Sequence, residues 1–295
     1  MRRWRDAIDG ALPALLPPRH ETAAAVHDAM AWTLLSAGKR IRPTLTLAVG
    51  EIYRVEARRL MPPACAIEMV HASSLILDDL PCMDDSPLRR GRAACHNQFG
   101  EATAILAAVG LLNHAFAILA GEPHGAPADS TRDRLRAIVA RRLAAAIGTD
   151  GVIGGQMADL AATGDGRPGQ VDLATLEFIH SHKTGSLFIA SAEVGAHLSG
   201  ATADELEALV AYAKNLGLAF QITDDLIDAV GESTAAGKPV RADAGKTTFV
   251  TLCGVEGART LASELVDTAI ASLDSFGRRA SRLRDLARFV ANRDR

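Results

Sequence analysis

The sequence is poor in aromatic residues and in net charge, and each shortage narrows what the protein can be. Phe, Trp and Tyr make up 4% of the 295 residues, whereas β-strands are enriched in aromatic side chains. Together with abundant alanine, a strong helix former, this composition favours closely packed helices over sheets. The formal net charge is −3, and a chain without a basic excess is a poor candidate for binding nucleic acid.

Cysteine and long charge-free apolar runs are also scarce. The four cysteines form no Cys-x-x-Cys pair, so neither a zinc site nor a disulfide framework is indicated, and we expect a cytoplasmic protein. The first residues, Met-Arg-Arg-Trp-Arg-Asp, lack the apolar segment of a signal peptide. We expect no membrane span, which needs a run of about eighteen apolar residues. Helical patterns continue without a linker or repeat, which predicts one domain over residues 1–295.

Two acidic runs, each following an apolar stretch, are what the sequence does have. They contain Asp78, Asp79, Asp84 and Asp85, and then Asp224, Asp225 and Asp228. Neighbouring carboxylates at about 4 Å repel by roughly 4 kcal/mol at an effective dielectric near ~20. One Asp-Asp pair most often caps a helix or lies in a solvated turn, but two runs with basic neighbours indicate a cation site with acids on both walls. Oxygen ligands without His or Cys favour magnesium over zinc.

Basic residues accompany both acidic runs. Arg89-Arg90 follows the first run, Lys238 follows the second, and Lys183-Thr184 lies between them. A phosphorylated ligand requires such cations, because metal ions bridge its oxygens on one side and charge-assisted hydrogen bonds hold them on the other. The turn Gly38-Lys39-Arg40-Ile41-Arg42-Pro43 is a second basic junction, either an anion site at a helix start or a solvated turn.

Apolar spacing predicts helices over residues 5–16, 20–36, 43–57, 60–79, 101–120, 131–148, 151–162, from 172 onward and 204–230, followed by two or three more. Helix 101–120 is apolar nearly all round, which predicts burial or a subunit interface. Pro81 ends helix 60–79, so Asp84 should curl back towards Asp78. Gly185 beside hydroxyl residues predicts a kink near Lys183.

Helix 204–230 places Asp224 and Asp228 on one face with Gln221, and turns Asp225 away by about 100°. Gln156 and Asp159 either face the acidic site or form an ordinary polar edge. The Gly-rich loop 231–246 suits a lid over the site.

These motifs resemble those of trans-isoprenyl diphosphate synthases, the polyprenyl synthetase family, closest to bacterial geranylgeranyl diphosphate synthases of the carotenoid-pathway type. The matching stretches are Gly38 to Pro43, Glu68 to Gly91, Phe99 to Glu101, Lys183-Thr184, Gln221 to Asp228 and Gly237 to Thr248. The resemblance implies an all-α fold, a large helical bundle around a deep central cavity, and usually a homodimer. Two departures, Ser86-Pro87 in place of further acids and Ala93-Ala94 in place of Pro-Thr, remove no expected ligand.

The resemblance also implies roles for individual residues. About three Mg2+ ions would be held by Asp78, Asp84, Asp224 and Asp228, with Asp79 and Asp225 in supporting roles. The allylic diphosphate would be surrounded by Arg89, Lys183, Thr184, Gln221 and Lys238. The diphosphate of isopentenyl diphosphate would be bound by Lys39, Arg42, His71 and Arg90, although a lone histidine such as His71 is more often a core residue. Lys246 would belong to the lid.

The implied reaction joins isopentenyl diphosphate to dimethylallyl, geranyl or farnesyl diphosphate. Ser73 and Ser74, just before Asp78, leave room for the growing tail where an aromatic residue would block it, and Val70 and Met69 are candidates for the next wall. We therefore predict geranylgeranyl diphosphate, with farnesyl diphosphate as the alternative product. A class I terpene cyclase, whose second motif is usually not Asp-rich, and a non-catalytic subunit that modulates a synthase are the rival functions.

Overall fold

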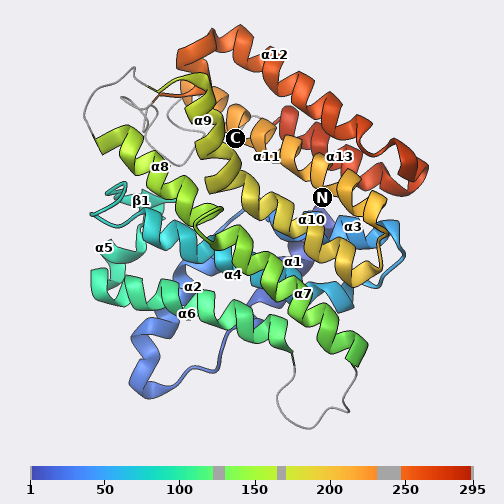
Figure 1. Cartoon of the computed structure of the whole chain (residues 1–295). Coiled ribbons are helices and arrows are strands. Elements are labelled where there is room, and N and C mark those ends of the chain that lie inside the picture. The colour runs from blue at the N-terminus through green and yellow to red at the C-terminus, as the bar shows by residue number, and fades with distance from the viewer. Residues whose placement is uncertain (1, 122–129, 165–170, 231–246, 294–295) are drawn as a thin grey trace.

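The chain is almost entirely helical where the computed structural model describes it, over residues 2–121, 130–164, 171–230 and 247–293 (Figure 1). The helices are α1 (Arg2–Leu15), η1 (Glu21–Ala23), α2 (Ala24–Leu34), α3 (Ile41–Ile52), α4 (Ala57–Asp78), α5 (Cys95–Phe99), α6 (Glu101–Ala120), α7 (Ser130–Ile147), α8 (Val152–Gly164), α9 (Leu173–His180), η2 (Ser181–Gly185), α10 (Ser186–Ser199), α11 (Ala203–Val230), α12 (Phe249–Ala271), η3 (Asp274–Ala280) and α13 (Ser281–Ala291). Two short strands, β1 (Leu88–Arg89) and β2 (Arg92–Ala93), form an antiparallel hairpin. The predicted all-α fold is confirmed.

The largest boundary error falls at the end of α3, which was predicted to reach residue 57 and ends at Ile52. The N–H of Val55 donates to the carbonyl of Gly50 (3.0 Å), and that of Arg54 donates to the carbonyl of Glu51 (3.1 Å). This hydrogen-bond pair is a Schellman stop, whose left-handed position usually holds glycine. Here Arg54 adopts φ 57°, so the sequence carries no glycine to mark the stop.

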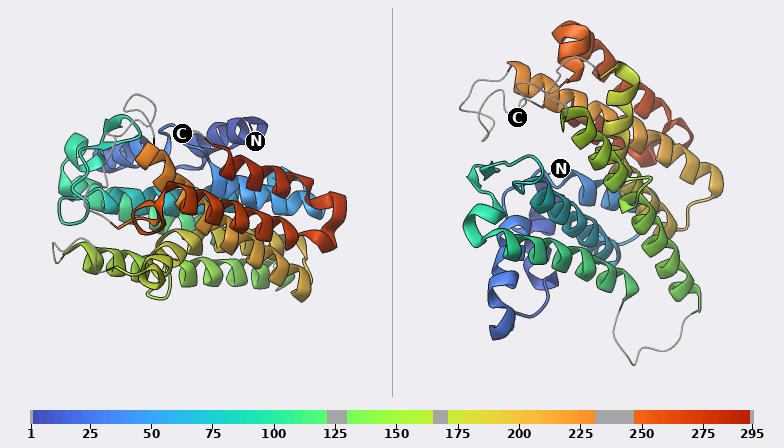
Figure 2. Two further views of the ribbon diagram at one scale, coloured as in Figure 1. Left: turned by 90° about the horizontal axis from the view of Figure 1, so that it is seen from above. Right: turned by 60° about the vertical axis from the view of Figure 1, so that its left-hand side comes forward.

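The core forms around α4 and α10. Helix α4 packs against α6, α3 and α10, while α10 also packs against α7 and α11, and α11 packs against α12 (Figures 1 and 2). One core cluster joins α4 to α6, and a second joins α3 and α10 to α11 and α13. The acidic runs lie at the C-terminal ends of α4 and α11. A helix C-terminus carries partial negative charge, so acids there attract cations more strongly.

Helix α6 is not buried within the chain in the way that its composition predicts. Its side chains Ile105, Leu106 and Val109 are 43%, 57% and 55% exposed. By length and composition alone both α4 and α6 could cross a membrane. Within the apolar 18-residue segment of each helix, 61% is buried in α4 but 33% in α6. Such a match is weak evidence, because core helices of soluble proteins meet the same criterion.

Candidate functional site

The first acidic run forms a turn that brings its two halves together. Helix α4 ends at Asp78, and the backbone N–H of Asp84 donates to the carbonyl of Asp78 (3.0 Å) while that of Asp85 donates to Leu80 (3.1 Å). Pro81 prevents the helix from continuing. The predicted return of Asp84 towards Asp78 is therefore confirmed at the level of the backbone.

The second aspartate of this run is structural. Asp79 is 2% exposed. Its two carboxylate oxygens share the N–H of Arg89 Nε, at 2.9 and 3.1 Å, and it accepts another hydrogen bond from Nη2 of the same residue. Burial alone would lower the pKa of Arg89, but the hydrogen bonds and charge of Asp79 raise it. Arg89 Nη2 also lies 3.9 Å from Asp78. Asp79 thus fixes Arg89 beside Asp78, and its supporting role at a metal site stays a prediction.

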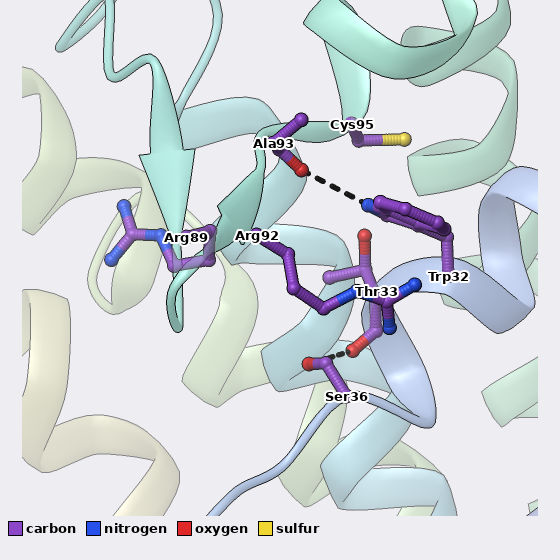
Figure 3. Close-up of a pocket in the computed structure, with 7 residues that line it drawn as sticks. All are labelled: Trp32, Thr33, Ser36, Arg89, Arg92, Ala93 and Cys95. Carbon is purple, nitrogen blue, oxygen red and sulfur yellow. Dashed lines mark hydrogen bonds between the residues drawn. The ribbon is translucent and has the colours of Figure 1, made fainter. Parts of the chain in front are cut away.

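The β1–β2 hairpin that carries Arg89 and Arg90 rests on α2 (Figure 3). The indole Nε1 of Trp32 donates to the carbonyl of Ala93 (3.0 Å), and the guanidinium of Arg92 lies 3.6 Å above the Trp32 ring. These residues line a small pocket, and the side chain of Arg89 points away from it (Figure 3). The contacts of Trp32 with Ala93 and Arg92 therefore hold the hairpin against α2.

Lys183 connects the first acidic run to a third carboxylate. Its Nζ lies 2.6 Å from Asp159 and 3.0 Å from Asp78. Burial would lower the pKa of Lys183, but these two acids raise it. Burial would raise the pKa of Asp78, but Lys183 lowers it. At neutral pH the site therefore holds an ammonium between two carboxylates, and Asp159 faces the acidic site rather than an outer edge.

The turn that carries Lys183 and Thr184 is a π-helix, η2, which is the irregularity predicted near Gly185. It fits between α8 and α11 because both neighbours offer glycine. A Cβ on Gly155 would lie 2.1 Å from the backbone nitrogen of Lys183, and one on Gly217 would lie 3.1 Å from Cα of Gly185. π-Helical turns are frequent at functional sites.

Thr184 joins the same turn to the second acidic run. Its hydroxyl donates to the side-chain carbonyl of Gln221 (3.0 Å), one turn before Asp224 on α11. The adjacent residues Lys183 and Thr184 therefore contact the ends of both acidic helices. This is the convergence of α4 and α11 that the sequence predicts.

Asp224 and Asp225 differ in the same way as Asp78 and Asp79, because the second aspartate of each pair is buried and the first lies beside a cation. Asp225 is 8% exposed, and its carboxylate accepts the backbone N–H of Phe249 (3.0 Å), the first residue of α12. Asp224 is 38% exposed, lies 2.8 Å from Nη2 of Arg293 and 4.0 Å from Nζ of Lys39. Arg293 could not be singled out from the sequence, because it is one of several arginines near the C-terminus and lies far from every motif.

The predicted isopentenyl-side residues form a basic group. Burial and then Arg42 and Arg90 hold the pKa of His71 well below its usual value, so the ring is neutral. Burial lowers the pKa of Arg42 to about 10, still well above neutrality, and its guanidinium lies 4.9 Å from the centre of the Phe188 ring. Burial, followed by Arg293, lowers the pKa of Lys39. The charge of Arg90 contributes to all three of these shifts, so Arg90 lies close enough to Lys39, Arg42 and His71 to affect each of them.

Arg40, in the same turn, is structural. Its Nε donates to Asp9 (2.7 Å), its Nη1 to Glu68 (2.7 Å), and its Nη2 to the carbonyls of Leu34 and Ser36 (3.0 and 2.7 Å). At 3% exposure and with φ 51°, this arginine fixes the backbone that carries its neighbours. In contrast, Nε of Arg42 is buried and has no hydrogen-bond partner in the described part of the chain.

The donor set fits magnesium that is shared with a ligand. In the described part of the chain, no three residues among His, Cys, Asp and Glu lie close enough together to hold a metal ion by themselves. Magnesium is commonly held by one or two carboxylates together with substrate phosphates. Asp78 and Asp224 each have a nitrogen cation within 3.0 Å, so both are placed to bind positive charge. Lys238 and Lys246 lie outside the described residues.

The predicted chain-length residues lie along α4. Ser73 is 3% exposed, and its hydroxyl donates to the carbonyl of Ala108 on α6 (2.8 Å). Ser74 is half-buried and donates to the carbonyl of His71 (2.9 Å). Val70 and Met69 are buried in the core between α4 and α6. Ser73 thus faces α6, whereas Ser74 turns to a different side of α4.

Comparison with known proteins shows which family the chain resembles in sequence and in fold. The polyprenyl synthetase family model covers residues 24–275. Geranylgeranyl pyrophosphate synthase from Capsicum annuum is 43% identical over 272 residues, which are 91% of this chain and 72% of that protein. The apo crystal structure of an FPP/GFPP synthase from Zymomonas mobilis aligns with TM-score 0.86 at 38% identity, over 98% of this chain and 97% of that one. Geranyltransferase from Helicobacter pylori, complexed with magnesium and isoprenyl diphosphate, aligns with TM-score 0.81 at 30% identity over 97% and 93%. The acidic helix ends, the lysine turn between them and these similarities identify the chain as a member of the polyprenyl synthetase family, a trans-prenyltransferase.

Proposed function

We propose that the chain condenses isopentenyl diphosphate with allylic diphosphates and releases geranylgeranyl diphosphate. The observation that carries the proposal is the Lys183-Thr184 turn, whose side chains bond to Asp78 and to Gln221 at the ends of the two acidic helices. A diphosphate between those ends would meet carboxylates and cations from both. The similarity to a geranylgeranyl pyrophosphate synthase supports the choice of product.

The allylic half of the site would act on the leaving diphosphate. Asp78, Asp84, Asp224 and Asp228 would hold about three Mg2+ ions together with diphosphate oxygens, and this metal charge would stabilise the diphosphate as it departs. Lys183 remains protonated because its pKa is raised, so its ammonium can donate to the same oxygens.

The isopentenyl half would orient the nucleophile. Lys39, Arg42 and Arg90 would bind its diphosphate, and the unpartnered Nε of Arg42 is a donor available for an anion. His71 is neutral, so it would take part through a hydrogen bond rather than through charge. Once the allylic carbon–oxygen bond has broken and the diphosphate has left, the double bond attacks the allylic cation, one carbon–carbon bond forms, and one proton passes to the departed diphosphate. Water must be excluded, because it would capture the allylic cation as an alcohol.

Incubation of the purified chain with labelled isopentenyl diphosphate, magnesium and each allylic primer tests the proposal. Mass spectrometry should find geranylgeranyl diphosphate as the end product, and Asp78→Asn should lower the rate at least about a hundredfold. Asp267→Asn, a surface change on α12, is the matched control and should leave the rate unchanged. Farnesyl diphosphate as the end product would indicate the alternative synthase. A cyclic hydrocarbon would indicate a cyclase, and an inactive chain that alters a partner's product a modulating subunit.

Product length is tested at Ser73 and Ser74. A phenylalanine at either position would fill the space before Asp78, so both variants should make a shorter product. Ser73→Phe also breaks the bond to Ala108 on α6, so its loss of stability should exceed that of Ser74→Phe. If neither variant shortens the product, the growing tail does not follow this part of α4.

We infer that the chain forms a homodimer through the exposed face of α6. Ile105, Leu106 and Val109 form an apolar stretch there, and contiguous apolar surface of this kind often marks an interface. Leu106→Glu should halve the mass measured by light scattering, whereas Leu252→Glu, at an apolar residue that is 41% exposed on α12, should not. A cytoplasmic location, expected from the cysteine pattern, remains a prediction to be tested by fractionation.

A further inference from the structure

Two buried arginines near the site have very different hydrogen bonding. Arg40 directs all three of its nitrogens to acceptors, including Glu68 and Asp9. Arg293 has a side chain that is 1% exposed, and its Nη2 is bonded to Asp224 at 2.8 Å and to the carbonyl of Phe220. Its Nε and Nη1 are buried, and neither has a hydrogen-bond partner among the residues that the structure describes.

An incompletely satisfied buried cation is costly to keep in place. Each unpartnered buried donor has lost its hydrogen bonds to water without replacement, and desolvation of the guanidinium opposes its attraction to Asp224. The Phe220 ring, 3.8 Å from the guanidinium, compensates in part. Lys39 lies 4.0 Å from the same Asp224, so two cations share one carboxylate. Arg293 is therefore held less firmly than its burial suggests.

Asp224 is also the residue that the proposed function assigns to a metal ion. A carboxylate that neutralises a guanidinium has less negative charge to offer a divalent cation. We propose that Arg293 is a displaceable counter-ion of Asp224, which competes with the metal at the second acidic run and must leave the carboxylate when the metal binds. This inference rests on the proposed function of Asp224 and adds a residue outside the motifs.

Metal binding without substrate tests the competition. Mn2+ titrated alone into the protein and followed by electron paramagnetic resonance should bind Arg293→Gln about three- to tenfold more tightly than wild type. Arg293→Lys keeps the charge and should remain within about twofold of wild type. Arg288→Gln, an exposed arginine on α13 whose ion-pair partner is Asp285, is the matched control and should not change the affinity.

The effect must also depend on Asp224. In an Asp224→Asn background, Arg293→Gln should change Mn2+ affinity by less than about twofold, because the carboxylate for which Arg293 and the metal compete is gone. Equal or weaker Mn2+ binding by Arg293→Gln, or equal gains in the Gln and Lys variants, would overturn the inference. Because no substrate is present, these outcomes are independent of prenyl transfer, so failure of the proposed function in the product assay is a separate result.

Discussion

The close contact between Gly155 on α8 and the backbone of Lys183 in the π-helical turn gives a quantitative prediction. A Cβ on Gly155 would lie 2.1 Å from the nitrogen of Lys183, 2.7 Å from its Cα and 2.8 Å from the carbonyl carbon of His182. These are backbone atoms, so no side chain can rotate away. Gly155→Ala must therefore separate α8 from the π-helical turn by roughly 1 Å to restore ordinary contact.

That displacement should affect catalysis more than stability. Overpacking of this kind costs about 1–3 kcal/mol, which for a chain of this size lowers the melting temperature by roughly 2–8 °C. The same displacement draws Lys183 away from Asp78, now 3.0 Å from its ammonium. A misplacement of about 1 Å at reacting groups can cost about a hundredfold in rate, so kcat/KM should fall by roughly that factor while the chain remains folded.

Two other glycines turn this prediction into a graded series. Gly217→Ala would bring Cβ to 3.1 Å from Cα of Gly185 and should have a smaller effect. Gly10→Ala has nothing within 4 Å, so it should leave kcat/KM unchanged. Because Gly10 lies inside α1, where alanine favours the helix, that variant should melt at a slightly higher temperature. Steady-state kinetics and thermal melts of the three variants give the ranking. Wild-type kcat/KM in Gly155→Ala, or a greater loss in Gly217→Ala than in Gly155→Ala, would refute the view that the π-turn is positioned by glycine contacts.

Three further changes follow from the site. Asp159→Asn removes one of the two carboxylates that bond to Lys183, so kcat should fall by about tenfold in steady-state assays with little change in melting temperature. Asp225→Ala leaves the N–H of Phe249 without its acceptor and should lower the melting temperature by roughly 2–8 °C. Because burial and arginines depress the pKa of His71, the folded chain binds fewer protons there than the unfolded chain. Stability should therefore fall as the pH drops below about 6.5, and less steeply in His71→Gln, when measured by urea unfolding without substrate.

The parts of the site that could be predicted from the sequence are those where local chemistry is repeated or interrupted. Two acidic runs after apolar helices, Pro81 after Asp79, and Gly185 among hydroxyl residues each constrain the backbone within a few residues. The structure confirms the return of Asp84 and the irregular turn at η2. The sequence does not decide whether Asp159 faces the site, because its partner Lys183 is 24 residues away and only packing brings the two together.

The parts that could not be predicted depend on contacts distant in sequence or on an unusual residue in a familiar position. In the sequence Arg40 is one of three cations in a basic turn, but in the structure it is paired with Glu68 and Asp9. Arg54 takes the left-handed position that glycine usually marks, which concealed the end of α3. Arg293 lies in no motif, and its place beside Asp224 depends on how α13 packs against α11.

Each acidic run begins with two adjacent aspartates, and the two members of each pair make different contacts. On a helix, adjacent residues point about 100° apart, so one pair can serve two directions. Asp79 and Asp225 are turned inward, where one orients Arg89 and the other holds the start of α12. Asp78 and Asp224 instead face the cations Lys183 and Arg293. The inward acid fixes the geometry in which the outward acid works, so loss of Asp79 or Asp225 should be felt first in stability and loss of Asp78 or Asp224 first in metal binding.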